Sequence, residues 1–155
     1  MNTQSVECNQ QSSEQPALFN MDNVQEQNIV QFPFGLPGFE MLTKFLIVEL
    51  DDYPPFYMLQ SLEEQEVTML ILNLKLLKVG KDIQIPRKEY SKIHLQDMTD
   101  AEVYVILKIN SETHQFTANI RAPLVINTRE RTGFQVILEN DQLSVEHSLV
   151  NAFVS

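Results

Sequence analysis

Short apolar runs, separated by polar or Pro/Gly-containing segments, recur along the sequence from residue 17 onward. Runs rich in β-branched and aromatic residues are predicted to be strands because such residues suit a pleated, half-buried surface. They are residues 45–50, 56–61, 67–72, 103–109, 115–120, 124–127 and 134–138, the last pairing with 143–145. Residues 17–21 and 28–32 are predicted to form a hairpin with a longer loop.

The pattern is less regular in the middle and at both ends. Residues 75–79 either extend a strand or begin an irregular crossing, and 83–85 form a short strand. Pro86 is a suitable helix start, with Tyr90 and Ile93 on the buried face of one or two helical turns. Residues 147–155 are predicted to be a short helix or frayed coil.

Many short strands with little helix indicate an all-β fold, a compact antiparallel β-barrel with one or two short helices. A closed barrel is favoured because closure removes the edges that such apolar strands would otherwise expose. Residues 1–16 are rich in Gln, Asn and Ser and have little to bury, so they are predicted to be a disordered tail. A single domain is expected to span residues 17–155.

The segment from Phe32 to Glu40 concentrates residues that interrupt regular structure. It holds three Phe, two of the seven Pro and two of the four Gly in the chain. Proline fixes φ and glycine permits positive φ, so the segment is predicted to be a rigid corner. Either its rings fill a small core, or part of it is presented to a partner. We expect Phe39, Leu59, Ile126 and Val136 in the core.

Charge and cysteine content narrow the class of protein. The formal net charge is −10, yet six of the eleven basic residues lie between Lys75 and Lys92. This balance favours basic protein partners and argues against direct nucleic-acid binding. Cys8 is the only cysteine, so no internal disulfide can form. No signal peptide or membrane-length apolar run is visible, and we expect a cytoplasmic protein.

Catalytic motifs are missing from the sequence. His94, His114 and His147 are scattered, and there is no glycine-rich phosphate loop, nucleophile elbow or metal-spaced His/Cys cluster. We therefore expect no enzyme activity, no metal and no cofactor.

Four apolar strings occur together and in order: 32–40, 55–61, 117–127 and 133–138. They resemble the flagellar assembly factor FliW family, whose similar pattern runs F-P-x-G-L-P-G-F-E, P-F-x-x-L-Q-S, T-x-N-L-x-A-P-L-V-I-N and G-x-Q-V-I-L. The resemblance covers about Ala17 to Leu149. One departure is Arg87-Lys88-Glu89-Tyr90, which stands where the family usually has a P-D-Y-like element.

The resemblance implies a non-enzymatic, monomeric β-barrel protein with two mutually exclusive partners. One is flagellin and the other is the translational repressor CsrA, whose capture would relieve repression of flagellin translation. Two alternatives remain open. The chain could be a dedicated flagellin chaperone without CsrA contact, or a barrel that binds a small ligand.

Glycines and prolines of these strings are expected to set the backbone, and the polar members are more informative. Gln60, Asn119, Asn127 and Gln135 either satisfy buried backbone groups or face a partner. The candidate partner-binding residues are Glu40, Phe56, Gln60, Ser61, Asn119 and Asn127.

Overall fold

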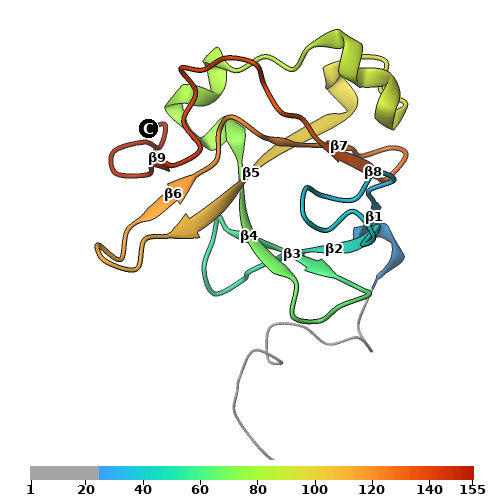
Figure 1. Ribbon diagram of the computed structural model, residues 1–155, viewed down its shortest axis with the longest axis horizontal. Coiled ribbons are helices and arrows are strands. Elements are labelled where there is room, and N and C mark those ends of the chain that lie inside the picture. Colours follow the sequence, from blue (N-terminus) through green and yellow to red (C-terminus); the bar gives the residue numbers. More distant parts are fainter. Residues whose placement is uncertain (1–24) are drawn as a thin grey trace, which may run out of the picture.

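The computed structural model describes residues 25–155 and consists mainly of short strands (Figure 1). The described strands are β1 (Ile29–Gln31), β2 (Lys44–Glu49), β3 (Tyr57–Ser61), β4 (Thr68–Asn73), β5 (Ala101–Ile109), β6 (Phe116–Ala118), β7 (Leu124–Asn127), β8 (Thr132–Gln135) and β9 (His147–Ser148). The helical turns of this region are 3₁₀ helices: η3 (Glu26–Asn28), η4 (Leu74–Leu76), η5 (Lys78–Asp82), η6 (Arg87–Ile93) and η7 (Met98–Asp100). The predicted tail, residues 1–16, and the predicted strand 17–21 lie outside the described residues.

Seven strands close into a barrel in the order β4-β3-β2-β1-β8-β7-β5, with β5 returning to β4. This confirms the predicted compact barrel. Neighbouring strands are antiparallel except β1 and β8, which are parallel and share the single pair Gln31↔Thr132. β6 and β9 extend the sheet outside the ring, because the far end of the long strand β5 pairs with β6.

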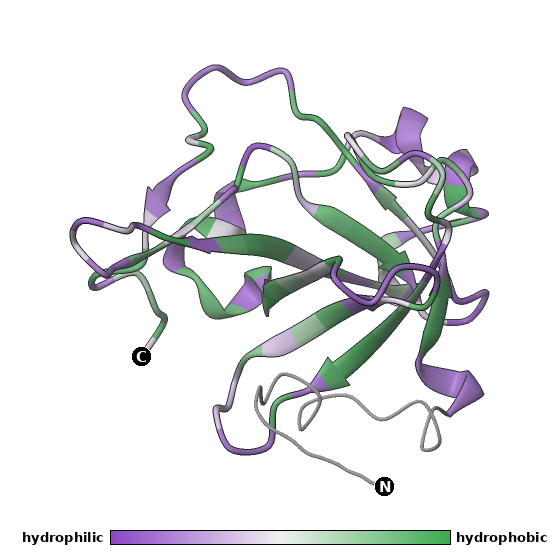
Figure 2. Cartoon of the chain, turned by 60° about the horizontal axis from the view of Figure 1, so that its bottom comes forward, coloured by the Kyte–Doolittle hydropathy of each residue, from purple (hydrophilic) through white to green (hydrophobic). Residues whose placement is uncertain are grey.

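The barrel interior is filled by apolar side chains that alternate inward along the strands, and Figure 2 shows the strands as the most hydrophobic parts of the chain. Phe32 and Phe45 meet edge to face, with ring centroids 5.3 Å apart. Leu59, Ile126 and Val136 are buried as predicted. Phe39 was wrongly predicted to be core, because 39% of it is exposed. Its backbone N–H closes a turn onto the Leu36 carbonyl at 2.7 Å, which buries the Leu36 side chain in its place.

Two predicted strands are absent from the described part of the chain. Residues 83–85 join no strand of the sheet, although Ile83 has extended dihedral angles. Residues 143–145 form no strand because the preceding segment already has a partner. Val136 and Leu138 donate to the carbonyls of Pro123 and Arg121, so the chain after them crosses to Ile120 instead. β8 begins at Thr132, two residues before the predicted start.

The last residues were wrongly predicted to be helix or frayed coil. β9 pairs with β6, and Phe153 forms an isolated bridge with Leu77. Lys78 N–H donates to the Ala152 carbonyl at 2.8 Å, and Val154 N–H donates to the Leu76 carbonyl at 2.9 Å. The reason is packing, because Ala152 is buried among side chains of η4, β5 and β6.

The basic middle of the chain resolves into 3₁₀ turns in place of a strand. Residues 75–79 belong to the irregular alternative, since η4 and η5 follow β4 directly. Pro86 precedes η6 as predicted, and Ile93 at the end of this helix is buried. No helix in residues 25–155 is both long and apolar enough to cross a membrane.

Candidate partner-binding site

The corner from Phe32 to Glu40 is held by short backbone hydrogen bonds. Phe32 N–H donates to the Thr43 carbonyl at 2.7 Å, and Gly35 N–H donates to the Phe32 carbonyl at 2.8 Å. Gly35 has φ +65°, and a Cβ at this position would lie 2.6 Å from the Glu40 Cα atom. Any side chain there would displace the backbone of Glu40, so Gly35 determines where Glu40 sits.

The outer face of the corner is apolar. Phe34 is 57% exposed and Met41 is 88% exposed, and Phe39 is partly exposed between them. We call Phe34, Phe39, Glu40 and Met41 the corner patch. Large exposed apolar groups held on a rigid turn are typical of an interaction surface. Sequence reasoning missed these three apolar residues, although one tight corner cannot bury all of its rings.

The patch is braced from below by β8. The Phe34 ring meets the Phe134 ring edge to face at 5.8 Å, and the Lys92 ammonium lies 4.4 Å from the Phe134 ring centroid. Aromatic pairs and cation–π contacts of this kind favour a defined orientation. Phe34 is therefore presented to solvent on a supported base.

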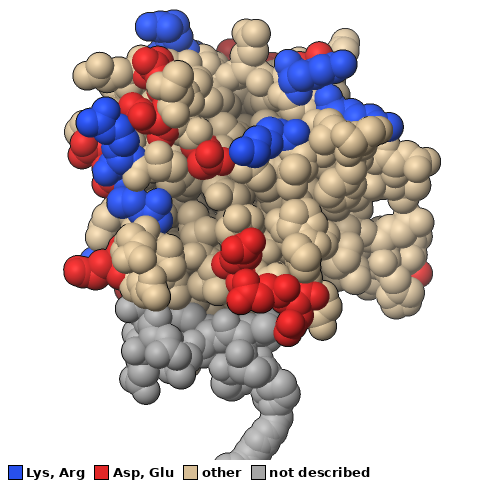
Figure 3. Space-filling view, turned by 180° about the vertical axis from the view of Figure 1, so that it is seen from behind, with Lys and Arg blue, Asp and Glu red and all other residues tan. Residues whose placement is uncertain are grey.

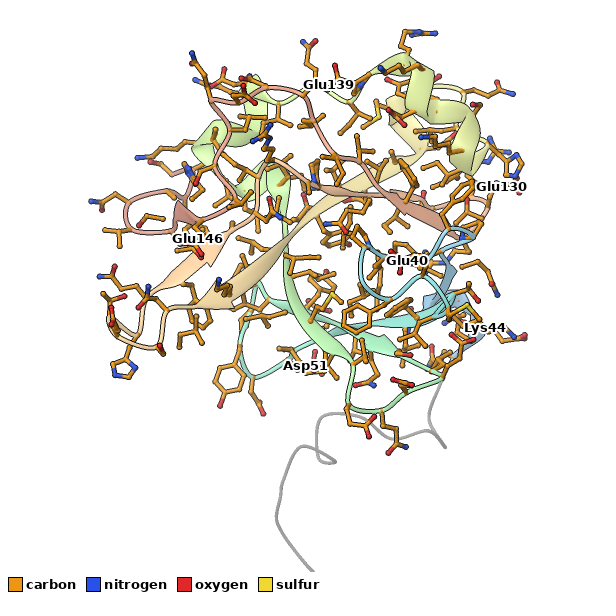
Figure 4. The ribbon with its side chains drawn as sticks, in the orientation of Figure 1. Glu40, Lys44, Asp51, Glu130, Glu139 and Glu146 are labelled. Atoms are coloured by element: carbon orange, nitrogen blue, oxygen red, sulfur yellow. The ribbon has the colours of Figure 1, made fainter. Side chains whose placement is uncertain are left out.

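Glu40 supplies a fixed negative charge within this apolar surface, and Figure 4 labels it on the loop beside β1 and β8. Its carboxylate accepts the Gly38 N–H at 3.1 Å. Gly38 has φ +87°, which turns its N–H toward the carboxylate. Hydrogen bonds from the backbone N–H of Gly38, and then from that of Glu40 itself, lower the pKa of Glu40 below its ordinary 4.5. The carboxylate thus stays charged at neutral pH and is oriented.

Gln60 and Ser61 are buried at the end of β3 and bond to the chain around them. Gln60 Nε2 donates to the carbonyls of Ser61 and Gln65, both at 3.0 Å. Ser61 Oγ accepts the N–H groups of Glu63 and Glu64 at 3.1 and 3.0 Å. Both side chains therefore shape the turn between β3 and β4.

Asn119 and Asn127 do the same for the turns that flank β7. Asn119 Oδ1 accepts the N–H groups of Arg121 and Ala122, both at 3.2 Å. Asn127 Oδ1 accepts those of Arg129 and Glu130 at 3.0 and 3.1 Å. These bonds agree with the alternative in which the polar residues of the strings satisfy backbone groups. Gln135 fits it too, since its Nε2 donates to the Ala122 carbonyl at 2.9 Å.

Phe56 is half-buried and belongs to a different part of the core from the corner. Its ring lies 6.1 Å from that of Phe116, among side chains of η4, β5 and β6. Phe32 and Leu36 of the corner instead pack with Phe45 and Ile126. The six predicted residues therefore do not converge on one surface, and Glu40 alone belongs to the corner patch.

A polar hollow of about 270 Å³ lies at one end of the barrel and bears on the small-ligand alternative. Its lining includes Glu49, Tyr57, Glu102, Tyr104 and Arg131. Burial, followed by the nearby Tyr57 and Glu102, raises the pKa of Tyr104 to about 12. Such a hydroxyl is a poor acid or base at neutral pH. Within residues 25–155, no group of three or more His, Cys, Asp and Glu side chains could hold a metal ion.

Charge is distributed unevenly over the surface. In the view of Figure 3, most Lys and Arg side chains lie over the upper part of the molecule, and a group of Asp and Glu side chains lies below. The basic segment, residues 75–92, contains η4, η5 and η6. One carboxylate within it, Glu89, pairs with Lys92 at 2.8 Å.

Comparison with known proteins gives a consistent result. The family model described as FliW protein matches residues 15–149. The flagellar assembly factor FliW of Alkaliphilus metalliredigens is 32% identical over 133 residues, which cover 85% of this chain and 82% of that protein. The protein of the same name from Caldicellulosiruptor bescii is 32% identical over 140 residues, 90% of this chain and 91% of its own length. A solved structure, "Crystal structure of the flagellar assembly factor FliW", superposes with a TM-score of 0.74 at 29% identity, covering 86% of this chain and 91% of that one.

Proposed function

Because the chain belongs to the FliW family of flagellar assembly factors, we propose that it acts in the cytoplasm by binding flagellin and, alternatively, the translational repressor CsrA. It works as a monomer without catalysis or a cofactor. Free factor captures CsrA and relieves repression of flagellin translation. Accumulated flagellin captures the factor in turn, so that CsrA silences the message. Each partner thereby lowers the apparent affinity of the other.

The observation that carries this proposal is the corner patch. Phe34, Phe39 and Met41 offer apolar area on a rigid turn, and Glu40 adds an oriented carboxylate among them. Apolar and aromatic anchors beside a fixed polar group are the usual composition of a protein-interface hot spot. We further propose that Phe56, which is half-buried away from the patch, contributes a separate aromatic contact. Gln60, Ser61, Asn119 and Asn127 would support partner binding indirectly, by holding the turns after β3 and on either side of β7.

Charge favours a basic partner over RNA itself. The chain has a formal net charge of −10, which would attract a basic RNA-binding protein and repel its RNA backbone. Exposed charges are screened by salt over about 10 Å at 0.1 M ionic strength, so CsrA binding should weaken as salt rises. Salt-independent binding would remove electrostatics from the proposal.

Substitution of Glu40 tests the patch. Glu40→Gln should weaken binding of purified flagellin or CsrA at least tenfold in isothermal titration calorimetry, because a hot-spot side chain contributes about 2 kcal/mol or more. The matched control is Glu139→Gln, an exposed glutamate after β8 that makes no salt bridge in the described chain. The control should bind like the wild type. Equal affinities for both variants would exclude Glu40 from the interface.

A competition experiment tests the partner switch and separates it from the alternatives. Purified factor should retain flagellin or CsrA on a column, and adding the second partner should release the first. A stable ternary complex would contradict mutual exclusion. A dedicated flagellin chaperone would release no RNA from a CsrA–leader RNA complex. A small-ligand barrel would show a thermal shift with a metabolite mixture, for which the hollow beside Tyr104 is the place to look.

A further inference from the structure

A groove on the basic side of the molecule has two extended walls and no strand between them. Its volume is about 610 Å³. One wall is the start of β5, Ala101–Val103, and the other is the segment Ile83–Ile85 between η5 and η6. In Figure 1 this segment runs along the top of the molecule, above the start of β5.

The β5 wall is a sheet edge. Ala101 and Val103 pair with Asn127 and Val125 of β7 on one side. On the other side the pairing with β4 stops at Asn73↔Tyr104, because the chain leaves the sheet as η4 at Leu74. Residues 101–103 therefore have a partner strand on one side alone among the described residues. An edge of this kind is a template for a further strand.

The opposite wall has strand character without a strand partner. Its sequence, Ile83-Gln84-Ile85, predicts a strand, and Ile83 has φ −105° and ψ 122°. Ile83 and Ile85 are half-buried, whereas Gln84 between them is exposed. This alternation is that of a strand with one face toward a core. Pro86 follows at once and has no N–H to donate, which limits pairing at that end.

The lining of the groove combines an apolar floor with a cationic rim. Val103 and Met98 contribute apolar surface beside the two isoleucines. Lys75 and Arg87 also line the groove, and neither forms a salt bridge in residues 25–155. The Arg87 guanidinium lies 5.6 Å from the ring centroid of Tyr90, which holds it at the rim. The one carboxylate of the lining, Glu102, accepts a hydrogen bond from the Asn73 amide through one oxygen at 2.6 Å.

We propose that this groove binds an extended peptide segment of a partner protein as an added strand, with apolar side chains facing the floor and carboxylates facing Lys75 and Arg87. Main-chain hydrogen bonds supply affinity in this mode of recognition, and alternate side chains supply specificity. The lining of the groove shares no residue with the corner patch, and the proposal stands whether or not flagellin or CsrA proves to be the partner.

Synthetic peptides on the full chain test the proposal. The probe is a short capped peptide of alternating valine and glutamate, followed by chemical-shift changes of backbone amides. It should bind with millimolar or better affinity and shift the amides of Gln84, Ile85 and Val103. A valine–lysine peptide should bind at least tenfold more weakly. An N-methylated valine–glutamate peptide keeps the side chains but lacks backbone donors, and it should also bind at least tenfold more weakly.

Variants separate groove binding from general attraction to the basic segment. Lys75→Glu and Arg87→Glu should each lower the affinity for the valine–glutamate peptide at least tenfold. Lys81→Glu makes the same charge change on an exposed residue outside the lining and should change affinity less than twofold. Glu40→Gln should bind the peptide like the wild type. A negative result for partner binding at the corner patch can therefore be told apart from a negative result for peptide binding in the groove.

Four outcomes would overturn the proposal. The first is no binding at millimolar peptide, and the second is equal binding of the N-methylated peptide. The third is contact between the groove amides and the chain's own residues 1–24. The fourth is a change in the groove amide chemical shifts that grows with protein concentration when no peptide is present. The third result would mean that the chain fills its own groove, and the fourth that a second copy does.

Discussion

Asn127 shows how one buried polar side chain organises three segments at the residue scale. Its Nδ2 donates to the Ile93 carbonyl at 2.8 Å and the His94 carbonyl at 3.3 Å, at the end of η6. Its Oδ1 accepts two N–H groups of the turn between β7 and β8. The asparagine therefore links the end of η6 to the turn after β7, and all of its hydrogen-bonding atoms are used.

Replacing Asn127 by alanine should lower the free energy of unfolding by about 2–3 kcal/mol, because buried backbone groups would lose their partners. Asn110 offers a matched control. Its Oδ1 accepts the N–H groups of Glu112 and Thr113 at 2.8 and 3.0 Å, but on an exposed loop where water can replace it. Asn110→Ala should cost less than about 1 kcal/mol. Urea denaturation of both variants measures the difference, and similar losses would contradict a buried linking role for Asn127.

The raised pKa of Tyr104 predicts how the free energy of unfolding changes at alkaline pH. Burial raises its pKa to about 12 from the ordinary 10. Between these values the unfolded chain releases the proton while the folded chain keeps it, so the free energy of unfolding falls as pH rises from 10 to 12. Tyr57 acts in the same direction, since burial and the charge of Glu49 raise its pKa too.

The contribution of Tyr104 can be isolated by comparing urea denaturation at pH 9 and pH 11.5. Tyr104→Phe should lose less stability over this interval than the wild type, because the raised pKa has been removed. Tyr53→Phe changes an exposed tyrosine in the loop before β3 and should match the wild type. A loss in Tyr104→Phe as large as that of the wild type would contradict the assignment.

At the scale of elements, the sequence predicted strands correctly where β-branched and aromatic residues form a continuous run. β2, β3, β4, β5 and β7 fall within a residue or two of the predicted runs, since each is a β-branched or aromatic stretch bounded by turn residues. The local sequence pattern failed where the available partner strand determines whether a segment becomes a strand. Residues 83–85 have the composition of a strand, but they pair with no strand of residues 25–155, and both sides of β4 are already taken by β3 and β5. Residues 147–148 look like coil and become β9, because β6 offers an edge.

The same division applies to the candidate site. The rigid corner at Phe32 to Glu40 could be predicted, because proline and glycine have local consequences. Which rings point outward could not, since the Leu36–Phe39 turn determines it. Gln60, Ser61 and Asn127 looked equally suited to a partner and to the backbone. Gln60 and Ser61 bond within the turn that follows β3, whereas the bond from Asn127 to Ile93 appears only when distant segments come together.

At the scale of the whole molecule, the barrel is closed by unequal seams. β2 and β3 share five consecutive pairs, from Phe45↔Ser61 to Glu49↔Tyr57. β1 and β8 share the single parallel pair Gln31↔Thr132. Two further bonds support this closure: Gln31 N–H donates to the Arg131 carbonyl at 2.9 Å, and Arg131 Nε donates to the Ile29 carbonyl at 3.3 Å. The corner from Phe32 to Glu40, which carries most of the corner patch, begins immediately after β1, so the weakest seam adjoins the candidate site.

We therefore expect the barrel to open first between β1 and β8. In native-state hydrogen exchange followed by mass spectrometry, peptides covering β1 should exchange at least tenfold faster than those covering β3, a difference of about 1.4 kcal/mol in opening free energy. Arg131→Ala removes the side-chain bond to Ile29 and should speed exchange of β1 further while leaving β3 unchanged. Arg129→Ala, whose guanidinium reaches Asp100 at 3.7 Å on the surface, should leave both unchanged. Uniform exchange around the ring would mean that the barrel opens as one unit, and the corner patch would then be as rigid as the strands behind it.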